Sequence, residues 1–192
     1  NKSINNIKAK NIFKKVKKNI KVGSDKNLKI IDITVEEKPT GEISLGAGIG
    51  SAGGTLGGGI KENNFLGRGI TLDSSLALTA DTIKGQFVYS KPNFAYTDNT
   101  LFTSIESTSN DKMKVYGYKT TGMGFALSTK FEQYDNLFFR PEISTNTEKL
   151  ETNSTATSEL KAQNGDYFDA NFNYSLDYDL RNKRYQPSDG YR

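Results

Sequence analysis

The clearest pattern in the chain is a strict alternation of apolar and polar residues over 166–181. The apolar positions are Phe168, Ala170, Phe172, Tyr174, Leu176, Tyr178 and Leu180, and the polar ones are Asp169, Asn171, Asn173, Ser175, Asp177, Asp179 and Arg181. A period of two indicates a β-strand with one apolar face. Strands of soluble proteins average about 5–6 residues, whereas a tilted membrane-spanning strand needs about 9–11. The segment therefore predicts a membrane-spanning strand, with Phe168 and Tyr178 near the two interfaces.

The same alternation recurs along most of the chain. Seven further strands are predicted at 41–51, 54–63, 69–79, 82–90, 100–109, 118–132 and 137–147. Their short connections predict an antiparallel up-and-down meander, as in a transmembrane β-barrel. The side chains that we expect to face lipid are Ile43, Leu45, Leu72, Leu76, Phe87, Phe168, Phe172, Tyr174 and Leu176.

The predicted connections fall into two alternating sets, which an up-and-down barrel places on opposite sides of the membrane. One set is 51–53, 80–81, 110–112 and 148–165, and the other is 63–68, 91–99, 133–136 and 182–190. The segment 148–165 is rich in Thr, Ser and Asn and nearly lacks apolar residues. Such a composition does not repay the entropy of ordering, so we expect a mobile extracellular loop.

The first strand of the meander has the fewest side chains. Its apolar face holds Ile43, Leu45, Ala47 and Ile49, and its polar face holds Glu42, Ser44, Gly46, Gly48 and Gly50. Glycine weakens strand packing and leaves the pairing register loosely specified. We therefore expect this strand to be the weakest of the meander.

The chain before Pro39 has a different character. Ser3 is positioned to cap a short helix that contains Ile4, Ile7 and Asn11, and strands are predicted at 14–22 and 28–36 around a turn at 23–27. This is a small α+β unit that lacks its beginning. The predicted domains are thus 1–38 and 39–192, both inside a longer protein, because the chain does not start with methionine and stops after a turn.

Composition excludes several classes of function. The net charge of +4 divides into +9 for residues 1–30, which hold ten Lys and one Asp, and −5 for the rest, so general nucleic-acid binding is disfavoured. The chain has no Cys and no His, which removes thiol chemistry, the usual general base and most zinc sites. We expect neither enzymatic activity nor a cofactor.

Three local patterns match known functional motifs without indicating the corresponding function. Residues 48–53 match the GxGxxG pattern of dinucleotide sites, but the glycines that follow oppose the required helix. Asp177 and Asp179 lie on one face, as catalytic carboxylates do, yet lining of a polar lumen explains them. The triplet Asn153-Ser154-Thr155 is a glycosylation sequon by pattern only.

Five segments, in order, resemble the BamA family of outer-membrane β-barrel assembly factors of Gram-negative bacteria. They are Val35-Glu36-Glu37-Lys38-Pro39-Thr40-Gly41, the glycine-rich strand that follows, Glu62-Asn63-Asn64-Phe65-Leu66-Gly67-Arg68-Gly69, Lys91-Pro92-Asn93-Phe94, and Asp179-Leu180-Arg181 with Pro187-Ser188-Asp189-Gly190. The resemblance implies the end of a periplasmic POTRA domain over residues 1–38, and then roughly half of a sixteen-stranded barrel.

The resemblance also implies a function and partners. The family's first barrel strand pairs poorly with the last, which forms a lateral gate at which incoming barrel proteins add strands. The corresponding edge here is Gly41, Glu42, Ile43, Ser44, Leu45, Gly46, Ala47, Gly48, Ile49, Gly50 and Ser51. Implied partners are barrel precursors, lipid and, through the POTRA domain, accessory lipoproteins. The implied location is the outer membrane, with the N-terminal part in the periplasm.

Two alternatives stay open. The first is a polypeptide-translocating pore, as in the related two-partner secretion or TamA transporters, for which a polar lumen fits equally well. The second is a soluble β-sandwich adhesin, in which the apolar strand faces would meet each other rather than lipid.

Overall fold

The structure is a computed structural model that describes residues 4, 7–8, 10–25, 27–50, 53–134, 136–181 and 188–191, without the side chains of 133 and 134. Ile4, Ile7 and Lys8 are helical, as predicted, but the proposed cap Ser3 lies outside the described residues. Asn11 is not helical and has φ +54°. No helix within the described part has the length and hydropathy needed to span a membrane.

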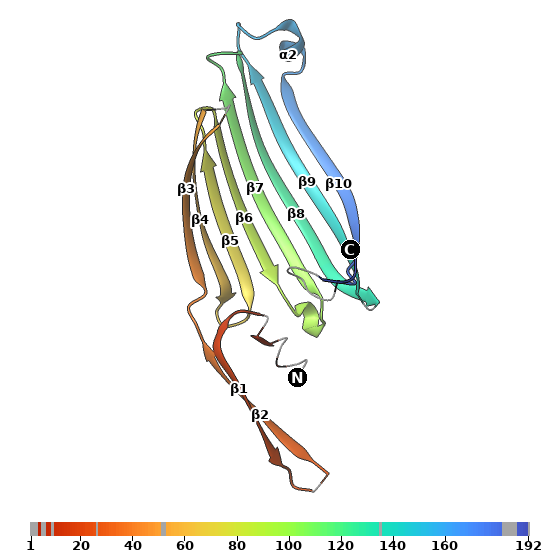
Figure 1. Ribbon diagram of the computed structural model, residues 1–192. Helices are drawn as coiled ribbons and strands as arrows, with labels where there is room; N and C mark the ends of the chain where they lie inside the picture. Colours follow the sequence, from red (N-terminus) through yellow and green to blue (C-terminus); the bar gives the residue numbers. More distant parts are fainter. Residues whose placement is uncertain are drawn as a thin grey trace.

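The N-terminal unit contains an antiparallel hairpin of β1 (Phe13–Val22) and β2 (Lys29–Glu37). Figure 1 shows this hairpin projecting from one end of a much larger sheet. Its Ile20–Ile31 and Val16–Val35 pairs share one face, on which Ile20, Ile31 and Val35 are exposed. An isolated two-stranded hairpin is marginally stable in water.

The remaining strands form one antiparallel sheet in the order β10-β9-β8-β7-β6-β5-β4-β3, a meander in chain order. The strands are β3 (Gly41–Gly50), β4 (Gly53–Phe65), β5 (Ile70–Leu78), β6 (Thr82–Lys91), β7 (Thr100–Lys112), β8 (Tyr118–Tyr134), β9 (Leu137–Thr152) and β10 (Gly165–Tyr178). Two short helices, η1 (Phe94–Tyr96) and α2 (Ser158–Ala162), lie in connections. The sheet is a curved wall that is not closed, and its edges are β3 and β10 (Figure 1).

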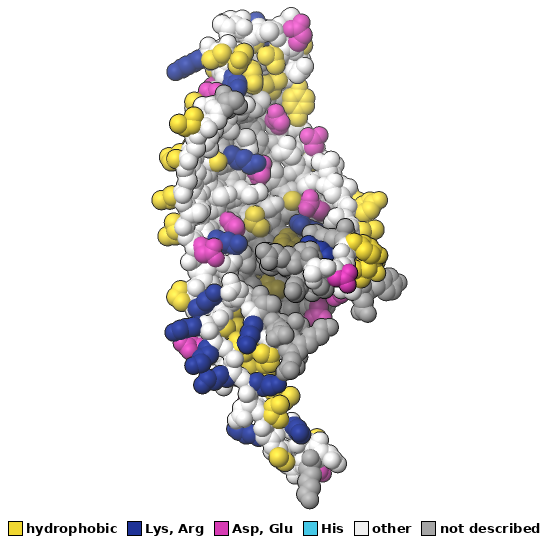
Figure 2. Space-filling model, in the orientation of Figure 1, with side chains coloured by type: hydrophobic (Ala, Val, Ile, Leu, Met, Phe, Trp, Pro, Cys, Tyr) yellow, Lys and Arg dark blue, Asp and Glu magenta, His cyan; other side chains and the backbone are white. Residues whose placement is uncertain are grey.

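The pairing register divides the sheet into two faces. Ile43 pairs with Ile60, Ile60 with Ser74, Ser74 with Phe87 and Phe87 with Ile105, and the same row continues to Ala170 on β10, two residues from Phe172 on the same face. We call the face that holds this row the apolar face. The opposite, polar face includes Glu42, Lys61, Asp73, Glu106 and Asn171. Figure 2 looks into the hollow of the sheet and shows mainly polar and charged side chains there, with hydrophobic ones projecting at the margins.

The sheet encloses almost no protein core. The buried apolar residues among those described are Ile12, Ile70, Leu150 and Ala156, and no large side chain is fully buried. No second layer covers the apolar face in the described part of the chain. A β-sandwich requires two such faces packed together, so the adhesin hypothesis does not fit this architecture.

Several predicted boundaries were wrong. β9 continues to Thr152 instead of ending at Thr147, and α2 follows, so the predicted loop 148–165 is partly strand and partly helix. β7 likewise runs on to Lys112. β10 ends at Tyr178, which leaves Leu180 and Arg181 outside the strand although they continue the alternating pattern. In each case the strand ends where its hydrogen bonding with the neighbouring strand ends. The sequence pattern does not show where that pairing stops.

Candidate functional site

The edge strand β3 is exposed along its whole length. All ten of its residues are solvent-exposed, and Ile43, Leu45 and Ile49 have relative exposures of 79%, 87% and 96%. β3 pairs residue for residue with β4, and no other described strand pairs with it. In an antiparallel ladder a strand directs its N–H and C=O groups alternately to its two sides, so the free side of β3 presents unpaired groups.

The glycines of β3 are not required by local packing. A Cβ atom added at Gly46, Gly48 or Gly50 would meet no described atom within 4 Å. On β4, by contrast, a Cβ at Gly59 would lie 3.0 Å from the carbonyl oxygen of Ser74, and one at Gly58 would lie 3.0 Å from Cδ2 of Leu45. Relief of crowding therefore explains Gly58 and Gly59 on β4 but not Gly46, Gly48 and Gly50 on β3.

The residues predicted to face lipid all lie on the apolar face. They are Ile43, Leu45, Leu72, Leu76, Phe87, Phe168, Phe172, Tyr174 and Leu176. Leu72 is half-buried and the others are exposed. Their common face follows from the pairing register, and contact with lipid stays a prediction.

Charged residues limit the apolar face at one end. Asp111, Lys119 and Glu151 pair in one row across β7 to β9, and Lys149 and Asp166 pair in the next row across β9 and β10. Two ion pairs join these charges, Lys149 Nζ–Glu151 Oε1 at 2.8 Å and Lys119 Nζ–Asp111 Oδ2 at 3.9 Å. From Phe168 to Tyr178, β10 has no charge on this face. At about 3.3 Å per residue and a tilt of about 40°, that stretch spans about 25 Å, the height of the apolar band of membrane barrels.

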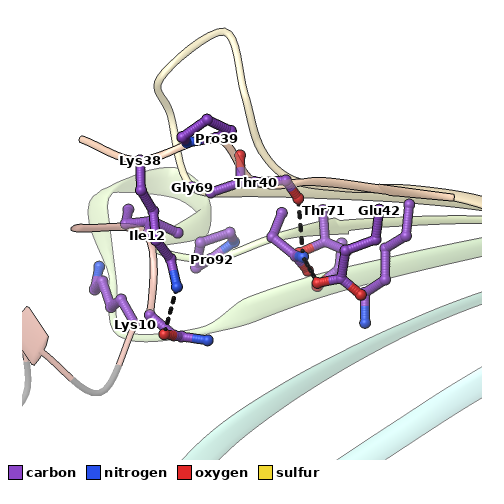
Figure 3. A pocket seen from close by; sticks show the side chains of 13 residues that line it. Lys10, Ile12, Lys38, Pro39, Thr40, Glu42, Gly69, Thr71 and Pro92 are labelled. Carbon is purple, nitrogen blue, oxygen red and sulfur yellow. Dashed lines mark hydrogen bonds between the residues drawn. The ribbon is translucent and has the colours of Figure 1, made fainter. Parts of the chain in front are cut away.

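The N-terminal end of the edge strand β3 lies beside a polar pocket of about 460 Å³ (Figure 3). Residues of the N-terminal unit, the linker and the sheet line it together, among them Ile12, Lys38, Thr40, Glu42 and Asn63. Lys38 Nζ donates to Asn11 Oδ1 at 2.8 Å, and Asn63 Nδ2 donates to Thr40 O and to Glu42 Oε1 at 3.2 and 3.0 Å. Lys38, Thr40, Glu42 and Asn63 belong to the family-like segments, whereas Asn11 and Ile12 do not, and nothing in the sequence pattern indicated this network.

The two aspartates considered as a carboxylate pair are separated by the end of β10. Asp177 is in the strand and pairs with Phe138, whereas Asp179 lies beyond it. Asp179 accepts hydrogen bonds from Nε and Nη2 of Arg181 at 2.7 and 2.6 Å, and these bonds raise the pKa of Arg181. Within the described residues there is no group of three potential metal ligands.

The polar face also holds a cluster that the sequence analysis missed. Arg140 donates from Nε and Nη2 to Oγ of the buried Ser128 at 3.2 and 3.1 Å, and its guanidinium lies 4.8 Å from the ring centroid of Phe102. Lys130 Nζ lies 4.5 Å from the ring centroid of Phe138. These contacts let aromatic side chains lie on a polar surface, since cations cover their faces.

Comparison with known proteins agrees with this description. An Omp85 superfamily domain matches residues 64–192, which is β5 to β10 and the end of β4. The chain belongs to the Omp85 superfamily. It is thus an outer-membrane protein with a BamA-like sheet.

A solved structure shows the same fold. The crystal structure of BamA from Haemophilus ducreyi lacking POTRA domains 1–3 is similar with a TM-score of 0.72 and 21% sequence identity. The match covers 98% of this chain and 39% of that one, so the chain spans well under half of that protein. No curated protein matches the chain in sequence.

Proposed function

We propose that this chain is the N-terminal barrel portion of an assembly factor of the BamA type, which folds and inserts barrel proteins into the outer membrane. In this proposal β3 is one side of a lateral gate, and the last strand of an incoming precursor pairs with its free side. The observation that supports it most directly is that β3 is exposed at every position. At Gly46, Gly48 and Gly50 an added Cβ atom would meet no described atom within 4 Å, so local packing does not require these glycines.

Backbone pairing suits an assembly factor that accepts many different clients. N–H and C=O groups are the same in every sequence, so an edge that offers mainly backbone discriminates little between clients. An edge with few side chains also loses little packing when it separates from a closing strand. No covalent bond is made or broken in this function, and no cofactor is needed.

The N-terminal unit is proposed to be the end of a POTRA domain in the periplasm, where accessory lipoproteins would contact it. Its hairpin has an apolar face that the described residues leave exposed, which a further part of such a domain would cover. The match to the Haemophilus ducreyi protein covers 98% of the chain and so includes β1 and β2, which supports this proposal. The charged row at Asp111 and Lys119 would then lie at the cell surface.

The alternative is a translocation pore of the two-partner secretion or TamA type. The polar face of the sheet favours it, because a client that threads the lumen would touch residues such as Glu106 and Asp177 rather than the edge. The two functions thus differ in which surface the client meets.

Disulfide crosslinking in the full-length protein separates the two. Single cysteines at Ser44 and Gly48 on β3, and matched cysteines at Ser104 and Ser175 on the polar face, would be tested against a barrel precursor with one cysteine in its last strand. Assembly by strand pairing predicts products at the β3 positions. Products at Ser104 and Ser175 alone would show that the client passes through the lumen.

A further inference from the structure

The first residues of the edge strand are held by a dense set of hydrogen bonds. The Thr40 hydroxyl donates to Oε1 of Glu62, and the Asn63 N–H donates to Thr40 O at 3.3 Å. The Asn63 side chain donates to the same Thr40 carbonyl at 3.2 Å and to Glu42 Oε1 at 3.0 Å. We call Thr40, Glu42, Glu62, Asn63 and Asn64 the foot clamp.

Asn64 joins the clamp to the turn between β4 and β5. Its N–H donates to Glu62 Oε1 at 2.7 Å, and its Oδ1 accepts from the Gly69 N–H at 2.7 Å. Asn64 is one of the few buried polar residues described, at 8% exposure. The β4–β5 register shifts between Glu62 and Phe65, a bulge that leaves Asn63 and Asn64 out of the regular ladder. Bulges commonly re-aim side chains in this way.

The linker before the clamp is fixed on its other side. The Lys38 N–H donates to Ile12 O at 3.2 Å, and Lys38 Nζ donates to Asn11 Oδ1 at 2.8 Å. Ile12 is buried, at 7% exposure. Figure 3 shows Lys38 and Thr40 on opposite sides of Pro39, with Ile12 and Glu42 at the two ends of the pocket. Proline restricts the backbone between these two attachments.

The far end of the same strand has no comparable support. Gly46, Gly48 and Gly50 have open space on their faces, and Ile49 is 96% exposed. β3 therefore pairs with β4 along its whole length, but side-chain hydrogen bonds support its first residues and not its far end. The glycine-rich part by itself specifies its pairing register weakly, because no side chains on the polar face distinguish one register from the next.

Register is what a pairing edge has to control. A slip of one residue exchanges the two faces of the added strand, which would direct its apolar side chains into the hollow. We propose that the foot clamp consists of positioning residues that hold the start of β3 at one place, so that an incoming strand pairs in a single register. This inference rests on the proposed function and adds a mechanism for its accuracy.

Disulfide crosslinking tests this proposal through the distribution of crosslinks over the positions of the precursor strand, not through their total yield. A cysteine at Ser44 in the full-length protein would be paired with a barrel precursor whose single cysteine is moved one residue at a time along its last strand. The unmodified clamp predicts one dominant partner position. The variants Thr40→Val and Asn63→Ala would be tested singly and together. Each hydrogen bond that they remove should raise the yield of crosslinks at the neighbouring precursor positions about 2- to 10-fold, while the total yield of crosslinks stays the same.

Thr71→Val is the matched control. Thr71 lines the same pocket, and no clamp hydrogen bond involves it, so this variant should keep the single register. If the double variant fails to accumulate in the membrane, Thr40→Val alone serves, since it exchanges a hydroxyl for a methyl of similar size. A single unchanged register in the clamp variants would overturn the positioning role. Absence of β3 crosslinks even with the intact clamp would instead refute strand pairing itself.

Discussion

The two edges of the sheet, β3 and β10, both expose backbone but differ in what surrounds it. Four of the ten residues of β3 are glycine, whereas β10 has a side chain at every position after Gly165. Tyr174 of β10 lies 6.4 Å, centroid to centroid, from Phe139 of β9, and Phe172 pairs with Ile143. β10 is therefore attached to its neighbour through side chains as well as backbone, and β3 mainly through its backbone and the foot clamp.

The chain beyond each edge differs too. After β10 the chain turns back, so that the Leu180 N–H donates to Tyr191 O at 2.9 Å and the rings of Tyr178 and Tyr191 approach to 6.3 Å. The free side of β3 has no such neighbour among the described residues. This difference supports the proposal that β3, rather than β10, is the edge that pairs with another protein.

The largest expected effect lies on β10. Phe172→Arg should lower the free energy of unfolding by about 2–4 kcal/mol, because it places a charge in the middle of the apolar face. Asn173→Arg, on the polar face one residue away, should cost much less. Denaturant unfolding from lipid vesicles measures both. Equal costs would mean that the apolar face does not contact lipid.

The glycines of β3 and β4 should respond in opposite directions. Gly59→Ala should destabilise the protein by about 1–3 kcal/mol, because its Cβ would crowd the Ser74 carbonyl oxygen at 3.0 Å. Gly48→Ala meets open space and should stabilise the strand by about 0.5–1 kcal/mol through reduced backbone entropy. The stiffer edge should also slow client insertion, which folding of a precursor in vesicles containing each variant would measure. Faster or unchanged insertion with Gly48→Ala would argue against a flexible edge.

The smallest expected effect concerns α2, which orders the connection into β10. The Glu159 carboxylate accepts hydrogen bonds from the backbone N–H of Glu159 and from the side chains of Thr157 and Ser158. These hydrogen bonds lower the pKa of Glu159 below the usual 4.5. A lowered pKa stabilises the folded loop above pH 4.5, and this stabilisation is lost as the pH falls through the lower, folded value. Amide exchange of Leu160 should therefore show extra opening below pH 4.5, relative to Glu159→Gln. An identical pH response in both proteins would exclude this role for Glu159.

The alternating pattern predicted the strands of the sheet and one shared face for Phe172, Phe87 and Leu45, because period-two alternation reports directly on a half-polar surface. It overextended β10 to Arg181, since alternation continues past the last residue that pairs with β9. It shortened β9, because residues such as Glu148 and Thr152 look like loop residues but pair with β8 beyond the apolar band. Composition alone cannot distinguish a strand that extends above the membrane from a loop.

The candidate edge was predictable from its glycines, but the foot clamp was not. Glu62, Asn63 and Asn64 acquire their roles through a bulge and through contacts to Thr40, about twenty residues away in sequence. Such contacts depend on the register between β3 and β4. Only the folded arrangement fixes that register.

Protection of individual β3 amides from hydrogen exchange tests the central claim most directly. In the full-length protein without a client, amides of 42–50 that point toward β4 should be protected, and the alternate amides on the free side should exchange rapidly. Addition of a barrel precursor arrested during assembly should protect those alternate amides and leave the rest of the pattern unchanged. If the precursor instead protects only residues of the polar face and the free-side amides of β3 still exchange rapidly, strand pairing at this edge is contradicted.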